Sequence, residues 1–285
     1  MTYACVEAQN LRKGDLVVCA QPKTHRSGVS WSPQEARFIG AYLGDGWIRS
    51  ESGIHSGHTV GLAIGASHET HTADYQALLG ELFPGVVWKN NAKGAFGLTC
   101  NSKHVWKRVV ALGISGSSKE RRLPQKAFAQ SAKAKKALLA GYFDADGTIL
   151  TPGFSNEGQG RAVCANKGLA QALRELAISA QMQVSNLRGQ TVVTNYGESQ
   201  IWQFCLSAED TATLPLWHRE KNAKLRAKMG REQGRRTKGL AAHDGVFFQS
   251  VLDIIQEGEE KVCDITVAHH THSFVCEGIV VHKQA

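Results

Sequence analysis

Two segments of this 285-residue chain repeat one pattern, and that repeat constrains the fold more than any other feature of the sequence. They are ARFIGAYLGDGWI at 36–48 and KALLAGYFDADGTI at 136–149. In each apolar run small residues stand four positions apart: Gly40 and Gly44, and Gly141 and Ala145. Residues four apart share one face of an α-helix, so each segment would present a bare face for close contact. We therefore predict two helices, over 36–45 and 137–146, packed on each other.

Each repeated segment closes on Asp-Gly. We expect Gly46 and Gly147 to end the helices in the left-handed conformation, which places Asp45 and Asp146 in the last turns. A carboxylate there is disfavoured by roughly 0.3–1 kcal/mol, and two side by side also repel each other. A divalent cation between them would remove both penalties. A single Asp-Gly is more simply a solvated turn, but two copies after matching helices favour a metal site.

The elements after each segment also repeat. Both halves read helix, strand, strand, helix, strand, strand, helix by their apolar periodicity. Lys119 follows Asp45 by 74 residues, and Lys221 follows Asp146 by 75. This near-equality is loose, because loop lengths differ between the two halves and partly cancel.

Positive charge is concentrated near the end of the second half. Residues 218–238 hold nine Lys or Arg against two Glu, in a chain whose net charge is +8. The stretch is either a solvated basic helix or a surface that faces nucleic-acid phosphates, and charge alone does not decide between them.

Composition excludes several other classes. A hydrophobic content of 42% is too high for a disordered polyelectrolyte. No apolar run is long enough for a membrane span, and we expect no membrane association, no targeting signal and a cytoplasmic or nucleoid-associated protein. The seven cysteines include no C-x-x-C pair, which disfavours a disulfide framework and a zinc ribbon.

The two segments, LAGYFDADG at 139–147 and FIGAYLGDG at 38–46, resemble the paired motifs of LAGLIDADG homing endonucleases. The first follows the pattern closely, and the second has the looser form common in endonucleases carried by inteins. The resemblance covers roughly residues 30–225. It implies an α/β (α+β) chain with a pseudo-twofold duplicated αββαββα fold, curved antiparallel sheets that straddle the major groove, a monomeric state and double-stranded DNA as partner.

The resemblance also implies a site. Asp45 and Asp146 would coordinate Mg²⁺ (or Mn²⁺) with the carbonyls of Gly44 and Ala145, and Lys119 and Lys221 would supply positive charge to the reacting phosphate. DNA contacts are expected from strand residues and from the basic stretch: Arg49, Lys89, Lys93, Arg161, Arg188, Arg219 and Lys224. His68 and Asn166 are weaker candidates for polarising water and serve equally well as ordinary turn residues.

The two ends of the chain resemble something else. Residues 261–283 are similar to the closing blocks of an intein splicing domain, with Asp264, His272 and His282 in the family's positions. Residues 3–22 are similar to the strand segment that leads into an intein endonuclease. No N-terminal nucleophile is present, and Lys283 stands where the terminal Asn belongs. We expect no self-splicing, and we expect the N-terminal segment to pair with residues 246–282 in one small sheet.

The predicted organisation is an N-terminal strand segment of a splicing-domain remnant, the two repeats, and the remaining strands of that remnant: 1–24, 30–125, 126–240 and 245–285. The function that the resemblance implies is a site-specific, metal-dependent double-strand DNA endonuclease. One alternative is a DNA-binding protein of the same fold without cleavage. A remote alternative is a haloacid-dehalogenase-type phosphatase with Asp144 as nucleophile, which needs a buried strand before that residue.

Overall fold

The structure is a computed structural model that divides the chain into two compact units, Lys23–Thr237 and Met1–Pro22 with Lys238–Ala285. It describes residues 6–19, 30–50, 57–63, 69–91, 97–151, 157–194, 197–229, 240–243, 246–251, 253–255, 273–276 and 279–282. Over these residues, no helix combines the length and apolar character that crossing a membrane requires.

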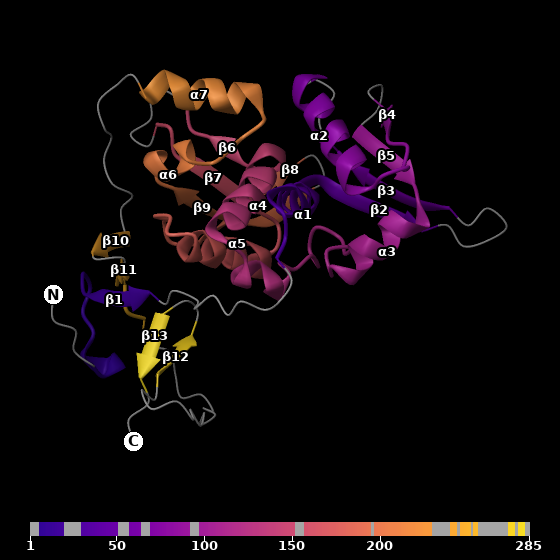
Figure 1. Ribbon diagram of the computed structural model, residues 1–285. Coiled ribbons are helices and arrows are strands. Elements are labelled where there is room, and N and C mark those ends of the chain that lie inside the picture. Colours follow the sequence, from indigo (N-terminus) through magenta and orange to yellow (C-terminus); the bar gives the residue numbers. More distant parts are fainter. Residues whose placement is uncertain are drawn as a thin grey trace. The chain divides into compact units, whose positions relative to one another are not determined.

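The larger unit contains the duplicated fold predicted from the sequence (Figure 1). The first repeat comprises α1 (Pro33–Asp45), β2 (Gly46–Ser50), β3 (His58–Leu62), α2 (Glu69–Leu82), β4 (Lys89–Asn91), β5 (Gly97–Asn101) and α3 (Lys103–Ala111). The second comprises α4 (Ala132–Ala145), β6 (Thr148–Ile149), β7 (Gly160–Cys164), α5 (Lys167–Ser179), β8 (Arg188–Thr194), β9 (Gly197–Leu206), α6 (Ala208–Ala212) and α7 (Arg219–Met229). A short 3₁₀ helix, η2 (Gln125–Ala129), precedes α4. The mixed helical and antiparallel fold class is therefore confirmed.

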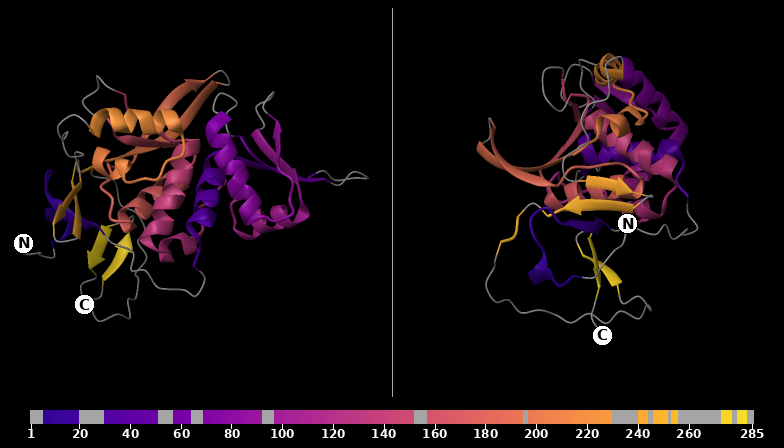
Figure 2. Two further views of the ribbon diagram at one scale, coloured as in Figure 1. Left: turned by 45° about the horizontal axis from the view of Figure 1, so that its top comes forward. Right: turned by 90° about the vertical axis from the view of Figure 1, so that its left-hand side faces the viewer.

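The sheets of the two repeats have the same antiparallel strand order within the described residues, β2-β3-β5-β4 and β6-β7-β9-β8. Side chains alternate between the faces of each sheet. One face is buried, and its residues are Val60, Leu62, Leu98 and Cys100 in the first sheet and Ala162, Cys164, Phe204 and Leu206 in the second. We call the opposite face of each sheet its open face. The β8–β9 hairpin curves away from the helices (Figure 2).

Helices α1 and α4 pack side by side between the two sheets (Figure 2), as the repeated segments predict. Ser32 and Ser131 cap their N-termini by accepting hydrogen bonds from main-chain N–H groups of the first turns. A Cβ at Gly40 would lie 1.8 Å from the carbonyl oxygen of Leu138, and one at Gly141 would lie 2.2 Å from that of Arg37. The backbones are so close that no side chain fits at either position.

The predicted role of Gly46 and Gly147 as left-handed terminators is wrong. Gly46 has φ −72° and ψ 155°, and Gly147 is not among the glycines with positive φ. Both are required for space instead. A Cβ added at Gly46 would lie 2.4 Å from the Tyr42 ring, and one added at Gly147 would lie 2.5 Å from the Phe143 ring. At both positions the chain turns from helix into strand against an aromatic side chain.

The smaller unit joins the two ends of the chain. Strand β1 (Leu16–Cys19) pairs antiparallel with β11 (Val246–Ser250) and with β13 (Ile279–His282), in a sheet ordered β10-β11-β1-β13-β12. The outer strands are β10 (Leu240–His243) and β12 (Ser273–Cys276), and η1 (Ala8–Asn10) precedes β1. The predicted pairing of the N-terminal segment with residues 246–282 is therefore present. Asp264 and His272 lie outside the described residues; the backbone of His282 belongs to β13.

Candidate active site at the paired helix ends

The C-terminal ends of α1 and α4 lie against each other and bring Asp45 and Asp146 together. A Cβ at Gly44 would lie 2.7 Å from Cβ of Ala145 and 3.4 Å from Cβ of Asp146. Asp45 is half-buried and Asp146 is exposed. The two aspartates thus lie next to each other, where each helix turns into the first strand of its sheet.

Both carboxyl groups have raised pKa values. Loss of hydration and the neighbouring Asp146 carboxylate raise the pKa of Asp45 to about 7, against the opposing effects of Lys221 and Arg121. Although the Asp146 side chain is exposed, the protein atoms around it displace water and raise its pKa as well. The protein alone therefore does not fully compensate the negative charge that the pair would carry with both carboxyl groups ionised.

Lys221 from α7 caps the end of α4. Its Nζ donates to the main-chain oxygens of Phe143 at 2.6 Å, Asp144 at 2.8 Å and Ala145 at 3.5 Å. The last carbonyls of a helix lack partners within the helix and carry partial negative charge. The ammonium group satisfies them beside Asp146, so the structure places Lys221 at the predicted site.

Arg121 does the same for α1. Its Nη1 donates to the main-chain oxygens of Tyr42 at 3.2 Å, Leu43 at 3.0 Å and Gly44 at 3.0 Å, and its Nη2 donates to that of Gly46. The guanidinium is buried. One planar cation therefore binds the entire turn that carries Asp45.

The resemblance implies matching positions for Lys119 and Lys221, but Arg121, and not Lys119, binds the end of α1 in the way that Lys221 binds the end of α4. The Lys119 side chain is exposed. Its main-chain oxygen accepts from Nδ2 of Asn166 at 2.8 Å, and the same amide group donates to the main-chain oxygen of Arg121 at 2.9 Å. Residues 119–122 hold three cations within one turn, so the spacing from Asp45 does not show which of them reaches the end of the helix.

The weaker candidates for polarising water find less support. The Asn166 amide is buried, binds the Lys119–Arg121 segment and accepts at Oδ1 from the main-chain N–H of Leu169 at 3.2 Å, where it caps α5. Its hydrogen-bonding groups are thus used within the protein. His68 lies outside the described residues.

The phosphatase alternative does not fit. Asp144 lies in the helix α4, not after a strand, and its buried carboxylate forms an ion pair with Arg37 at 2.7 Å. A nucleophile would have to be open to substrate. The helical geometry of the whole segment therefore excludes a phosphatase site of this kind.

The residues at the helix ends fit a hard divalent cation. Among the described residues, no group of three or more His, Cys, Asp or Glu side chains is arranged to hold a metal. Mg²⁺ is commonly bound by one or two carboxylates together with water and substrate phosphate, which matches two closely placed aspartates. The carbonyls of Gly44 and Ala145 accept from Arg121 and Lys221 and retain a second lone pair each.

The predicted base-reading residues lie on the open faces of the sheets. In the first sheet, the register places Arg49 opposite Thr59 and Lys89 opposite Thr99, away from the buried Val60 and Cys100. In the second sheet, Arg161 lies opposite Cys205 and Arg188 opposite Gln203. Lys93 lies outside the described residues.

Two further polar residues on the second open face, Gln190 and Gln203, were not predicted from the sequence. Gln203 donates from Nε2 to Oε1 of Gln190 at 3.3 Å, and the register of β8 and β9 places both on the same face as Arg188. Glutamine side chains can bind the edge of adenine with two hydrogen bonds. The alternation of polar residues in these strands was the signal that could have found them.

Two of the predicted DNA-binding residues, Arg219 and Lys224, lie on α7, which packs on the rest of the larger unit through Leu225. Arg219 is exposed and Lys224 is half-buried, while Leu225 packs into the protein. Residues 230–239, which hold the rest of the basic stretch, lie outside the described residues.

We expect the stability of the metal-free protein to fall as pH rises from about 4 to 7. Over that range folded Asp45, whose pKa is about 7, binds more protons than the unfolded chain, whose ordinary value is 3.8. Asp45→Asn removes this cost. Discounted for partial exposure, the variant should gain about 1–2 kcal/mol over the parent at pH 8, or roughly 2–4 °C in Tm, and almost nothing at pH 4. Thermal denaturation in EDTA at both pH values measures this, with Asp74→Asn on α2 as control. A gain independent of pH would contradict the environment described for Asp45.

Arg121→Ala should destabilise the protein far more than Lys119→Ala. Removing the guanidinium leaves buried carbonyls at the end of α1 without their donor, which should cost about 2–4 kcal/mol. Lys119 is exposed, so its truncation should change stability by less than about 0.5 kcal/mol. Urea denaturation compares the two variants. Equal losses of stability would contradict the role of Arg121 at the end of α1.

Comparison with known proteins gives a distant likeness. No family model and no curated protein matches the chain. Among solved structures it is similar to "The homing endonuclease I-WcaI bound to its DNA recognition sequence", with 14% sequence identity and a TM-score of 0.36, over 69% of this chain and 82% of that chain. A likeness at this level assigns neither a family nor an activity to this chain.

Proposed function

We propose that this protein is a site-specific double-strand DNA endonuclease of the LAGLIDADG type that uses Mg²⁺ or Mn²⁺ and acts as a monomer. One observation carries the proposal: two aspartates with raised pKa values meet at the adjoining ends of two equivalent helices. Each helix leads directly into a sheet whose open face carries Arg, Lys or Gln side chains. A pseudo-twofold pair of such half-sites suits a duplex with two antiparallel strands.

Asp45 and Asp146 would hold the divalent ion. When bound, that ion would polarise the scissile phosphate and lower the pKa of the attacking water. Arg121 and Lys221 keep the two carboxylate-bearing turns in place by binding the carbonyls of the helix ends. Their positive charges also reduce the mutual repulsion of the aspartates, which lets both ionise when the ion arrives.

The open faces of the sheets would read the sequence. Arg49, Lys89, Arg161 and Arg188 can donate to guanine edges in the major groove, and Gln190 can bind adenine. These residues lie on two equivalent sheets, one on each side of the paired aspartates, so their base contacts would fall on both sides of the scissile phosphates. Arg219 and Lys224 on α7 would add phosphate contacts.

Incubation with a plasmid library carrying random inserts tests the function. In Mg²⁺ or Mn²⁺ the protein should make double-strand cuts within one related set of sequences, read by sequencing the cut ends, and EDTA should stop the reaction. Absence of cuts in either metal contradicts the proposal. Sequence-selective binding without cuts would favour the alternative of a DNA-binding protein without cleavage.

Binding to the selected site should weaken steeply with salt. Replacing both Arg219 and Lys224 by Gln should lower the slope of log K against log salt by about 2, or about one for each phosphate that the variant no longer neutralises. Fluorescence anisotropy between 50 and 300 mM salt gives that slope, in a range where each neutralised phosphate changes the affinity by several-fold.

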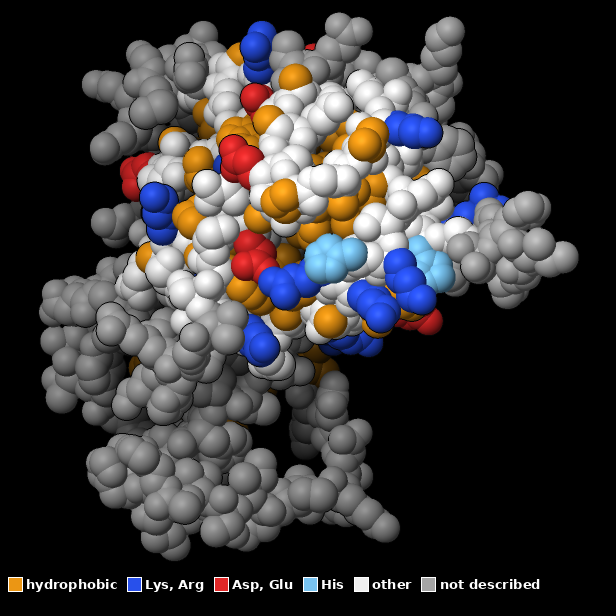
Figure 3. Space-filling view, turned by 45° about the vertical axis from the view of Figure 1, so that its right-hand side comes forward, with side chains coloured by type: hydrophobic (Ala, Val, Ile, Leu, Met, Phe, Trp, Pro, Cys, Tyr) orange, Lys and Arg blue, Asp and Glu red, His pale blue; other side chains and the backbone are white. Residues whose placement is uncertain are grey.

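A matched control comes from α3, whose exposed Lys103, His104 and Lys107 lie on a helix that covers the buried side of the first sheet. Figure 3 brings forward the side of the molecule that carries α3 and shows Lys, Arg and His side chains gathered on it. Lys103→Gln with Lys107→Gln removes the same charge and should leave the slope unchanged. An equal change of slope from both pairs would mean that α7 contributes only general charge.

A further inference from the structure

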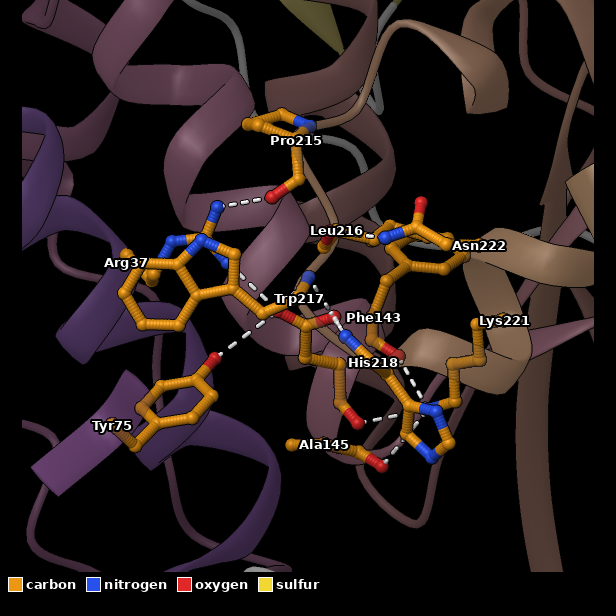
Figure 4. A network of polar contacts seen from close by, with 11 residues as sticks. Arg37, Tyr75, Phe143, Ala145, Pro215, Leu216, Trp217, His218, Lys221 and Asn222 are labelled. Carbon is orange, nitrogen blue, oxygen red and sulfur yellow. Dashed lines mark hydrogen bonds and ion pairs between the residues drawn. The ribbon is translucent and has the colours of Figure 1, made fainter. Parts of the chain in front are cut away.

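The carboxylate of Asp144 is the centre of a buried network that spans both repeats. Figure 4 labels its partners Arg37, Tyr75, Trp217 and His218. Arg37 of α1 donates to it at 2.7 Å, and the hydroxyl of Tyr75 of α2 donates to it at 3.3 Å. All three residues are buried. Two elements of the first repeat are thus connected to one side chain of the second.

The same carboxylate accepts two main-chain hydrogen bonds from the segment that enters α7. The N–H groups of Trp217 and His218 donate to it at 2.9 Å and 3.0 Å. The Arg37 guanidinium lies 4.0 Å from the centre of the Trp217 ring and also donates to the main-chain oxygen of Pro215. Asp144 therefore holds the chain directly before α7.

The first turn of α7 begins directly after this attachment point in the chain. The His218 ring stacks on that of His71 from α2 with their centres 4.9 Å apart, and the main-chain oxygen of His218 accepts the first helical hydrogen bond from Asn222. Lys221 lies within that turn, and its ammonium reaches the end of α4. Asp144 therefore binds the main chain directly before the helical turn that carries the Lys221 ammonium.

Within the described residues, the positions that correspond to Asp144 and Arg37 in the opposite repeats are apolar. When Asp45 is aligned with Asp146, Asp144 corresponds to Leu43 and Arg37 corresponds to Leu138, both of which are buried. Two leucines satisfy helix packing at the equivalent positions, and a buried ion pair is often replaceable by apolar residues of similar size. Packing of α1 on α4 therefore does not require the ion pair, whereas attachment of the α7 segment requires an acceptor at position 144.

We propose that Asp144 is a positioning residue for Lys221: it binds the main chain before α7 and so places the Lys221 ammonium at the end of α4 beside Asp146. The effect on cleavage rests on the proposed endonuclease function, while the effect on α7 does not.

Two double variants isolate this role. Arg37→Leu with Asp144→Leu and Arg37→Leu with Asp144→Asn both remove the ion pair, but only the second keeps an oxygen that can accept from Trp217 and His218. In the Leu variant, amide exchange over residues 217–222 should rise about tenfold, while α1 and α4 keep their protection. In the Asn variant, exchange over these residues should stay within about threefold of the parent.

Cleavage should separate the two variants in the same way. The Leu variant should lose about 10- to 100-fold in kcat with KM for DNA changed less than about threefold, because a displaced cation affects the reacting groups more than it affects binding. The Asn variant should retain most of the parental kcat. In a Lys221→Met background the Leu change should cost nothing further, since both act through the same ammonium. Glu35→Gln, which removes the Arg108–Glu35 ion pair between α3 and α1, serves as the control and should match the parent.

The outcomes distinguish this inference from the proposed function. If the parent cuts no DNA, the endonuclease proposal fails, and the exchange measurement still decides whether Asp144 holds α7. If the parent cuts and the Leu and Asn variants behave alike, or their losses add to that of Lys221→Met, the positioning role is overturned while the function stands. Rapid exchange of the Trp217 and His218 amides in the parent overturns it without any variant, even if the Leu variant does not fold.

Discussion

Asp45→Asn and Asp146→Asn should each abolish DNA cleavage, by at least about a thousandfold, while leaving DNA affinity within a few-fold of the parent. An amide is a neutral and much weaker ligand for a hard cation than a carboxylate. Affinity comes mainly from phosphate and base contacts on the sheets and on α7, which neither variant changes. Single-turnover cleavage of the selected site and anisotropy in Ca²⁺ measure the two properties separately.

Asp74→Asn is the control, because it removes an exposed acid from α2, far along the chain from either helix end. It should cut at the parental rate. If Asp45→Asn or Asp146→Asn also cuts at that rate, the paired aspartates are not the metal site. If both lose binding and cleavage together, the aspartates support the fold and not the chemistry.

Gly40→Ala and Gly141→Ala should each destabilise the larger unit severely, by about 3 kcal/mol or more. The added methyl would lie 1.8 Å from the carbonyl oxygen of Leu138 in the first case and 2.2 Å from that of Arg37 in the second. Both neighbours are main-chain atoms within helices, so relief requires the two helices to move apart. Urea denaturation measures the decrease in stability.

Gly80→Ala on α2 is the matched control, since no heavy atom lies within 4 Å of the Cβ that it would add. There the same substitution should stabilise the protein by up to about 1 kcal/mol, because alanine loses less conformational entropy than glycine in a helix. A small effect at Gly40 and Gly141 would mean that α1 and α4 do not pack through these glycines.

Much of the architecture could be predicted because it depends on local patterns. Small residues at helical spacing before Asp45 and Asp146 identified the two packed helices, and apolar periodicity identified the order of elements in each repeat. Strand-forming runs at the two ends predicted the pairing of β1 with β11 and β13. In each case the signal lies within a few residues of the element concerned.

The conformation and partners of individual residues could not be predicted in the same way. Gly46 and Gly147 were expected to be left-handed turns, but the requirement for glycine comes from the Tyr42 and Phe143 rings. An Asp-Gly pair signals a turn without showing which atoms surround it. Steric limits from packed side chains depend on the fold of the whole repeat.

The sequence by itself determined that two equivalent helices end on aspartates and that basic residues follow each by about 75 positions. Only the tertiary structure decided that Arg121 and not Lys119 binds the end of α1, and that Asp144 holds the chain before α7. Helical periodicity is a property of neighbouring residues, so the sequence carries it directly. A hydrogen bond between groups more than 70 residues apart depends on how the intervening helices and strands pack, and neighbouring cations in one basic run differ only in that respect.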